Sequence, residues 1–284
     1  MPLTELVHYV NQRHQHVFPS PCGKDVGLKM TEGRVQGQFG AWTLDSLFQP
    51  VADSASGQVL GHEAHLYLVD AEGLSQPAES LFDLAGSDAD LVFLDQFCRS
   101  LHALNFLLEK DQQDGFLSLN VHPQVLRVAG LDHGQEFETL LSRCGLSPER
   151  IVLEVTDDGL SDVNPIARAL QQQRSRGYRV ALDNFGRHSA DLERLETLGP
   201  DIVKLDRSLI GHSGHLSLAR RIVVDLSAEI RRLNSRMVCQ YIENPLQLAV
   251  AREVGMDWLQ GNLIGRPAIA CRPVYQAAND RIAA

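Results

Sequence analysis

The chain has 284 residues, 44% of them hydrophobic, which suits one large domain or one domain with a small appendage. Its formal net charge is −10, from 36 acidic and 26 basic side chains, and such a surface repels nucleic acid and anionic membranes. We therefore expect neither as a partner, and an anionic substrate would need metal ions or basic side chains placed locally.

Five widely spaced cysteines, with no Cys-x-x-Cys pair, argue against a disulfide framework in a chain of this length. The N-terminus is polar, and no apolar run approaches the roughly 18 residues that a membrane-spanning helix needs. We therefore expect a cytoplasmic protein with reduced thiols and no signal peptide.

Residues 1–40 differ from the rest of the chain and are expected to form an N-terminal extension. A short amphipathic helix fits the apolar positions near its start, which are Leu3, Leu6, Val7 and Val10. Two prolines and several glycines follow and predict irregular structure. Because His14, His16 and Cys22 follow no metal-ligand spacing, a solvated arm is favoured over a metal site.

Residues 41–284 are expected to form the main domain, which opens with a hairpin. The apolar runs 44–51 and 58–69 flank a turn-like Asp-Ser-Ala-Ser-Gly segment and therefore predict two antiparallel strands. From Asp88 onward, apolar residues recur every three or four positions as far as Leu108. This spacing predicts a long amphipathic helix capped by Ser87 or Asp88.

Strands and helices alternate from residue 116 onward. Six apolar runs predict strands, over 116–121, 151–155, 178–182, 201–205, 236–240 and 258–264. Helical patterns lie between them, over 135–144, from Pro165 to Gly177, from Ser189 to Leu198, over 222–233 and from Asn244 to Gly255. With the hairpin, eight strands and the alternating helices predict a TIM-like (β/α)8 barrel of the α/β class, with an irregular opening at an antiparallel first strand.

Oxygen-bearing side chains lie at or beside the ends of these apolar runs, namely Glu63, Asn120, Glu154, Asp183, Asp206 and Glu243. One strand-terminal acid alone is usually a solvated loop residue or a helix cap. A set that converges on one barrel mouth would repel itself unless a cation joined it. Carboxylate and amide oxygens are the ligands that Mg²⁺ or Mn²⁺ prefers, and two such ions would suit hydrolysis of a phosphodiester.

Lys204 stands among these acids, two residues before Asp206. In a hydrolytic site it would orient the attacking water or neutralise developing charge. The alternative, a strand-edge lysine held in a salt bridge, is equally open at this point.

The same stretches resemble, over about residues 44–267, the EAL domain family of phosphodiesterases that act on cyclic di-GMP. The motif that names the family, Gly-x-Glu-Ala-Leu, is similar to Gly61-His62-Glu63-Ala64-His65-Leu66. The other similar stretches are Phe48-Gln49-Pro50-Val51, Leu119-Asn120-Val121-His122-Pro123, Glu154-Val155-Thr156-Asp157, Asp183-Asn184-Phe185-Gly186, Lys204-Leu205-Asp206, Glu243 and Gln260-Gly261. No single stretch is specific, and the resemblance depends on their shared order and spacing.

The resemblance implies roles for individual side chains. Catalytic roles fall on Glu63, Lys204 and Glu243. Ligands of one divalent ion, Mg²⁺ or Mn²⁺, would be Glu63, Asn120, Glu154 and Asp183, with Asp206 and Glu243 at a second ion. Substrate contacts would come from Gln49, Leu66, Asn120, Gln260 and Arg266. A homodimer built through the loop after Phe-Gly is implied as well.

Several positions depart from the family pattern. Tyr67 stands where the family has an arginine that grips a substrate phosphate, and a neutral phenol cannot replace that charged planar group. Asn184 replaces the second aspartate of Asp-Asp-Phe-Gly, and Asp157 replaces the second glutamate of Glu-x-Thr-Glu. The loop from Arg187 lacks the usual Thr-Gly-Tyr-Ser-Ser, and Cys239-Gln240-Tyr241-Ile242 replaces Ala-Glu-Gly-Val.

Three functions stay open from the sequence. The favoured one is a catalytically impaired EAL domain that acts in cyclic di-GMP signalling by binding cyclic di-GMP or a protein partner. The alternative is a slow, metal-dependent phosphodiesterase that produces linear pGpG. The third is a protein-interaction module that binds neither metal nor nucleotide, through the altered loop around Arg187. We consider it less favoured that Arg187 replaces the missing positive charge than that it is an ordinary surface arginine. Metal binding by His65 or His188 is likewise less favoured than a role in a loop or in the core.

Overall fold

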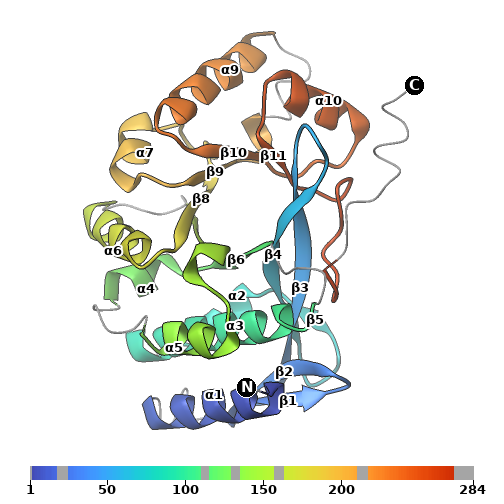
Figure 1. Ribbon diagram of the computed structural model, residues 1–284, viewed down its shortest axis with the longest axis vertical. Helices are drawn as coiled ribbons and strands as arrows, with labels where there is room; N and C mark the ends of the chain where they lie inside the picture. The colour runs from blue at the N-terminus through green and yellow to red at the C-terminus, as the bar shows by residue number, and fades with distance from the viewer. Residues whose placement is uncertain are drawn as a thin grey trace.

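Eight strands close into a barrel with helices on its outside in the computed structural model of the chain (Figure 1). The structure describes residues 2–17, 25–109, 115–128, 135–156, 163–209 and 217–271. The barrel strands are β3 (Trp42–Asp53), β4 (Val59–Val69), β6 (Phe116–Asn120), β7 (Ile151–Thr156), β8 (Arg179–Phe185), β9 (Ile202–Leu205), β10 (Arg236–Cys239) and β11 (Trp258–Leu259).

Around the barrel the strands follow the order β3, β11, β10, β9, β8, β7, β6, β4, and pairing of β3 with β4 closes the ring. β3 runs antiparallel to both barrel neighbours, whereas the other neighbouring strands pair in parallel. The cause is local, because the short turn after Asp53 can join only antiparallel strands. The predicted TIM-like (β/α)8 barrel with an antiparallel first strand is therefore confirmed.

The outer elements are α2 (Glu79–Phe82), α3 (Asp88–Phe106), α4 (Pro123–Val128), α5 (Gln135–Cys144), η3 (Pro148–Arg150), α6 (Val163–Ser175), α7 (Leu192–Leu198), α9 (Ser217–Arg232) and α10 (Pro245–Glu253). Ser87 caps α3 as predicted, by accepting a backbone hydrogen bond. Asp191 caps α7 in the same way, so this helix begins at Leu192 and not at the predicted Ser189. Asn244 forms a capping box that starts α10.

An apolar layer closes the barrel interior below the mouth. Each barrel strand contributes one side chain to it, namely Val51, Leu60, Phe116, Val152, Ala181, Ile202, Val238 and Trp258. Gly61 permits the closure, because a Cβ there would lie 2.4 Å from the carbonyl oxygen of Phe116 on β6. Side chains on a strand alternate between faces, so the next inward position on most strands lies one layer nearer the mouth. Polar residues occupy that layer.

The predicted irregular structure of the N-terminal extension is wrong for residues 25–40, whereas Pro19, Pro21 and Gly23 lie outside the described residues. Helix α1 (Leu3–Val17) is longer than the short helix expected, and two strands, β1 (Val26–Thr31) and β2 (Arg34–Phe39), follow it. β2 pairs antiparallel with the start of β3, so this segment continues the sheet of the barrel. The Asn11 side chain exchanges two hydrogen bonds with the backbone of Leu28, which fastens α1 to β1. A functional division at residue 40 stays a prediction.

The position of His14 shows why the interpretation of this segment as a solvated arm is wrong. The His14 ring packs against Phe93 and Phe97 of α3, with centroids 5.4 and 5.7 Å away. Burial lowers the pKa of His14 to about 4, so the ring is neutral at physiological pH. His14 therefore helps to hold α1 on α3, whereas Cys22 lies outside the described residues.

The last predicted strand is shorter than expected. Pairing in β11 ends at Leu259, and the chain returns to the sheet only where Ala268 bridges Phe48 of β3. The short final helix expected in the tail lies outside the described residues.

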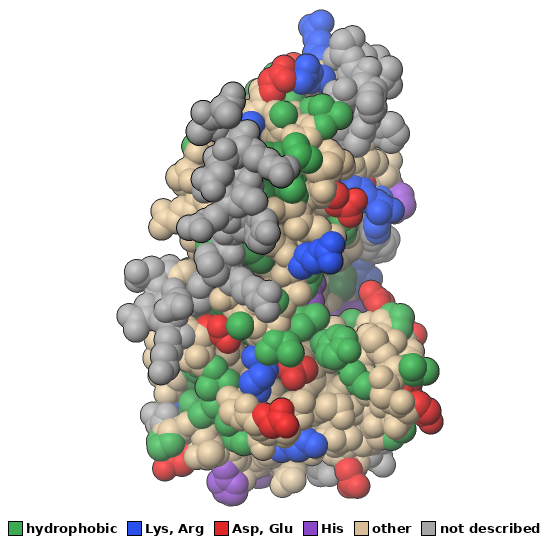
Figure 2. All heavy atoms as spheres, turned by 90° about the vertical axis from the view of Figure 1, so that its right-hand side faces the viewer, with side chains coloured by type: hydrophobic (Ala, Val, Ile, Leu, Met, Phe, Trp, Pro, Cys, Tyr) green, Lys and Arg blue, Asp and Glu red, His purple; other side chains and the backbone are tan. Residues whose placement is uncertain are grey.

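Acidic and basic side chains are interspersed on the face of the molecule shown in Figure 2. The net charge of −10 is therefore not gathered into one acidic patch on this face. Among the helices of the described ranges, none is both long and apolar enough to cross a membrane.

A buried histidine predicts acid sensitivity of the fold. His102 of α3 contacts Ser46 Oγ through Nδ1 at 2.8 Å, and burial lowers the pKa of His102 to about 3. Because the unfolded chain takes up the proton near pH 6.5, stability falls as the pH drops below that value. We expect wild type to lose about 2 kcal/mol more than His102→Asn between pH 7 and pH 5, measured by urea unfolding. Identical pH curves for the two proteins would contradict this assignment.

Candidate active site at the mouth of the barrel

A buried lysine is the centre of the polar layer. Lys204 of β9 is 2% exposed, and its Nζ donates to Glu63 Oε2 on β4 and to Glu154 Oε2 on β7, each at 2.7 Å. Asp183 Oδ1 on β8 lies 3.8 Å from the same nitrogen. Four charged groups that are far apart in sequence therefore meet inside the barrel, above its apolar layer.

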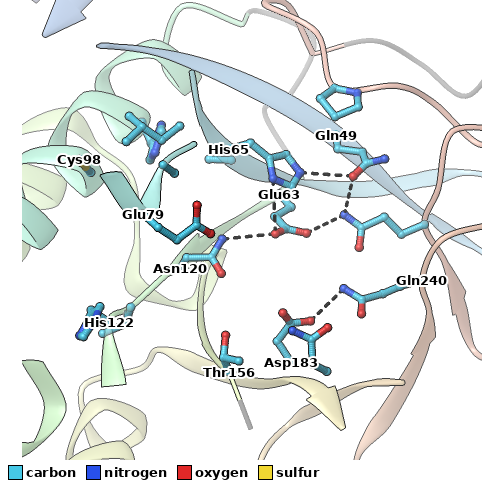
Figure 3. Close-up of a pocket in the computed structure, with 18 of the residues that line it drawn as sticks. Gln49, Glu63, His65, Glu79, Cys98, Asn120, His122, Thr156, Asp183 and Gln240 are labelled. Carbon is cyan, nitrogen blue, oxygen red and sulfur yellow. Dashed lines mark hydrogen bonds and ion pairs between the residues drawn. The ribbon is translucent and has the colours of Figure 1, made fainter. Parts of the chain in front are cut away.

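Glu63 accepts more hydrogen bonds than either of the other two carboxylates, and its neutral partners are drawn in Figure 3. Gln260 Nε2 donates to Glu63 Oε2 at 2.7 Å, and Asn120 Nδ2 donates to Glu63 Oε1 at 3.3 Å. His65 Nδ1 lies 3.8 Å from Glu63 Oε1. Gln49 Oε1 then joins His65 and Gln260, at 3.2 and 3.3 Å. This network holds the motif glutamate in one orientation.

The other two carboxylates are held by neutral donors. Ser118 Oγ donates to Glu154 Oε1, and Gln240 Nε2 donates to Asp183 Oδ1 at 2.9 Å. Each of the three carboxylates thus accepts a hydrogen bond from a neutral side chain besides its contact with Lys204. The arrangement orients the oxygens without neutralising them.

The cluster contains more acids than its one ammonium can neutralise. Burial and the charge of Glu63 together raise the pKa of Glu154 to about 8, against the opposing effect of Lys204. Burial also raises the pKa of Glu63, but Lys204 and His65 outweigh burial and hold it below its usual value. Burial lowers the pKa of Lys204, but Glu154, Glu63 and Asp183 outweigh burial and keep the ammonium protonated. An added cation would be favourable in this environment.

The predicted position at strand ends needs correction for three of these residues. Glu63, Glu154 and Asp183 lie within their strands, because these strands continue past them toward the mouth. Lys204 lies beside the end of β9, as the sequence predicted. Asn120 does end β6, as the sequence predicted.

The two residues expected at a second metal ion are not among the ion-pair partners of Lys204, although Glu243 lines the same cavity as Glu63 and Asp183. Asp206 follows β9, accepts from the backbone N–H of Ser208 at 2.9 Å and lies 3.5 Å from Arg187 Nε. Glu243 is exposed in the loop after β10. Within the described ranges, no three His, Cys, Asp or Glu side chains are grouped so that they would hold an ion as they lie. The oxygens expected around a metal surround the ammonium of Lys204.

A cavity of about 760 Å³ opens over the cluster. Of the predicted substrate contacts, Gln49, Leu66, Asn120 and Gln260 line it, and Leu66 also packs against the main apolar cluster. Arg266 is exposed and is not among the lining residues. The cavity extends over β4 and β6 toward α3 on one side and over β10 on the other.

Sequence analysis missed several polar residues of this site. Ser118 and Gln240 are absent from the predicted set, and His65 appeared there only as a less favoured metal ligand. Each lies two positions from an inward-facing residue on the same strand or strand extension, so alternation along the strand was the available signal. Arg207 also lines the cavity, and no pattern in the sequence indicates it.

Comparison with known proteins identifies the family. A model of the EAL domain matches residues 33–267. The chain belongs to the EAL domain family. MucR of Pseudomonas aeruginosa, a bifunctional diguanylate cyclase/cyclic di-GMP phosphodiesterase, is 29% identical over 227 residues, which are 78% of this chain and 32% of MucR. The probable cyclic di-GMP phosphodiesterase PdeA of Escherichia coli is 31% identical over 129 residues, which are 45% of this chain and 18% of PdeA.

Solved structures of EAL domains share the fold. A standalone EAL protein from Vibrio cholerae with cyclic di-GMP bound aligns with a TM-score of 0.73 at 22% identity, covering 83% of this chain and 97% of that one. The MucR phosphodiesterase complex with cyclic di-GMP aligns at 0.69 and 26% identity, covering 79% and 92%. A manganese and cyclic di-GMP complex of BlrP1 from Klebsiella pneumoniae aligns at 0.73 and 20%, covering 88% and 60%. Our chain spans less than half the length of MucR and of PdeA.

Of the positions at which this EAL domain departs from the family pattern, Asn184, Gln240 and Tyr241 line the cavity. Tyr67 is 41% exposed and is not among the residues lining the cavity. Asn184 has a left-handed backbone, with φ of 56°, and its buried Oδ1 has no hydrogen-bond partner among the described residues. Arg187 forms an ion pair with Asp206. The backbone of Tyr241 is also in the left-handed region, with φ of 57°. Asp157 lies outside the described residues.

Removing the central ammonium should destabilise this EAL domain in a pH-dependent way. We expect Lys204→Met to lower the free energy of unfolding by about 3–5 kcal/mol at pH 8, because it leaves buried carboxylates unpaired. The loss should shrink toward pH 5, since carboxyls whose folded-state pKa is raised by burial take up protons. Chemical denaturation at both pH values measures the difference, and Lys29→Met, at an exposed position of β1, is the matched control. Equal losses at both pH values would refute the explanation.

Proposed function

We propose that this EAL domain binds cyclic di-GMP at the barrel mouth, hydrolyses it poorly or not at all, and acts in cyclic di-GMP signalling as a binding module. The proposal for the ligand is supported by the family, by the bound cyclic di-GMP in the solved relatives, and by a cavity over the cluster. Gln49, Asn120 and Gln260 line that cavity and already point hydrogen-bonding groups into one network.

The donor chemistry fits one divalent ion, for which we propose Mg²⁺ or Mn²⁺. Glu63, Asn120, Glu154 and Asp183 would hold it, because they provide hard oxygen ligands with an excess of negative charge. Manganese in the BlrP1 complex supports this choice. When bound, such an ion would polarise a phosphate oxygen and lower the pKa of a water. Lys204 would keep the remaining carboxylate charge balanced, while Gln260 and Asn120 orient Glu63.

The ion pair between Asp206 and Arg187 is the observation that carries the proposal of impaired hydrolysis. It places a guanidinium, 3.5 Å away, against the carboxylate that the family resemblance assigns to a second ion. Asn184 contributes no charge beside it, and Glu243 is exposed. Two ions clamp both reacting oxygens in two-metal hydrolysis, so weak binding of the second ion would lower the rate while ligand binding persists.

A slow phosphodiesterase that yields linear pGpG is the second candidate. It is favoured by the persistence of Glu63, Asn120, Glu154 and Asp183 around Lys204. A protein partner and a homodimer remain proposals as well, and the exposed loop at Arg187 would be the contact in either case.

Calorimetry and a hydrolysis assay on the same preparation test the main proposal. We expect cyclic di-GMP to bind in the presence of millimolar Mn²⁺ or Mg²⁺, with little or no linear dinucleotide formed. Hydrolysis at an ordinary enzymatic rate that Glu63→Ala abolishes would establish the second candidate instead. The absence of cyclic di-GMP binding, with partner capture that depends on Arg187, would favour a protein-interaction module.

A gain-of-function variant tests the assigned cause of the impairment. Asn184→Asp with Arg187→Ala adds one carboxylate and frees Asp206 from its ion pair. We expect the affinity for Mn²⁺ to rise by about tenfold or more and hydrolysis of cyclic di-GMP to increase. Asn234→Asp is the matched control, because Asn234 is also left-handed, with φ of 60°, and exposed outside the cavity. Unchanged Mn²⁺ affinity in the double variant would exclude this cause.

A further inference from the structure

Tyr241 combines an unfavourable backbone with a position on the cavity. Its φ is 57°, in the left-handed region that bulky side chains rarely adopt because Cβ crowds the backbone. The side chain lines the cavity at the barrel mouth and is 43% exposed. The hydrophobic core does not explain a tyrosine at this position, because a ring that is this exposed contributes little to core packing.

The chain on both sides of Tyr241 is fixed, which explains how the conformation persists. Before it, Gln240 donates to Asp183 Oδ1, and Cys239 O accepts from the N–H of Gln260. After it, the N–H of Ile242 donates to Gln260 O at 3.1 Å, and Ile242 is fully buried. Strained residues that their surroundings hold in place are concentrated at ligand-binding sites. The strain therefore points to a role in binding.

Arg207 defines the chemistry of this rim. Its guanidinium carbon lies 5.8 Å from the centre of the Tyr241 ring, and both residues line the cavity. An aromatic ring supported by a planar cation is suited to a flat, polarisable ligand group attached to a phosphate. Arg207 and Tyr241 follow β9 and β10 in the chain, and they line the same cavity as Cys98, Arg99 and His102 of α3.

We propose that Tyr241, supported by Arg207, is a stacking platform for one base of cyclic di-GMP and contributes to the affinity for this ligand. This inference rests on the proposed function, because it requires the nucleotide to bind at the mouth. In this proposal Tyr241 contacts the ligand and takes no part in hydrolysis, which would depend on the cluster around Lys204. If the ring instead blocked the mouth, its removal would raise the affinity for cyclic di-GMP and not lower it.

Calorimetric titration of cyclic di-GMP into four variants separates these outcomes. Tyr241→Gly suits the left-handed backbone, so thermal unfolding should show a fold at least as stable as wild type. Its affinity should nevertheless fall about tenfold or more, as should that of Tyr241→Leu, because base–aromatic stacking is lost. Tyr241→Phe should keep the wild-type affinity. Tyr9→Leu is the matched control, since Tyr9 also carries an arginine, Arg143, over its ring at 4.2 Å, but in α1.

Each remaining result counts against the platform. Wild-type affinity in Tyr241→Gly would overturn it while leaving cyclic di-GMP binding intact. Tighter binding by Tyr241→Gly would show that the ring obstructs the mouth. A wild-type protein that binds no cyclic di-GMP at all would overturn both this inference and the proposed function.

Discussion

The contact of one buried ammonium with three buried carboxylates is the constraint on which the site depends. Lys204 lies within 2.7 Å of Glu63 and Glu154 and within 3.8 Å of Asp183, in a place that water does not reach freely. Carboxylates buried together would be costly without a cation. The lysine makes the cluster compatible with a folded barrel, and the excess of negative charge makes the same cluster a favourable place for a divalent ion.

The barrel supplies this cluster by dividing its interior into layers. Eight apolar side chains seal the lower layer, so polar groups are confined to the upper one. Parallel strands place residues of different sequence position at the same height, and alternation turns every second side chain inward. The antiparallel β3 contributes Gln49 beside Glu63 from the opposite chain direction. The neutral amides of Gln49, Asn120 and Gln260 therefore lie beside the carboxylate of Glu63 and add no like charge to it.

At the rim the charge balance differs from that of the cluster. Arg187 neutralises Asp206, Asn184 carries no charge, and Arg207 lies over the ring of Tyr241. Under the proposed function, these features would weaken the binding of a second ion and would add planar and positively charged groups to the cavity. Such a site would then hold an anionic nucleotide more readily than it would clamp both oxygens of a reacting phosphate.

The sequence by itself determined the order of the eight barrel strands, the longer helices between them, the antiparallel opening and the charged residues of the central cluster. Apolar periodicity and short motifs predict these features, because both are patterns of residues that lie close together in the chain. It could not determine that β1 and β2 continue the sheet, since the glycines that suggested irregular structure also suit strands and turns. Only the tertiary structure decided that Lys204 occupies the centre, that Arg187 reaches Asp206, and that Arg266 lies outside the cavity. These facts depend on distances between residues far apart in sequence, which no local pattern encodes.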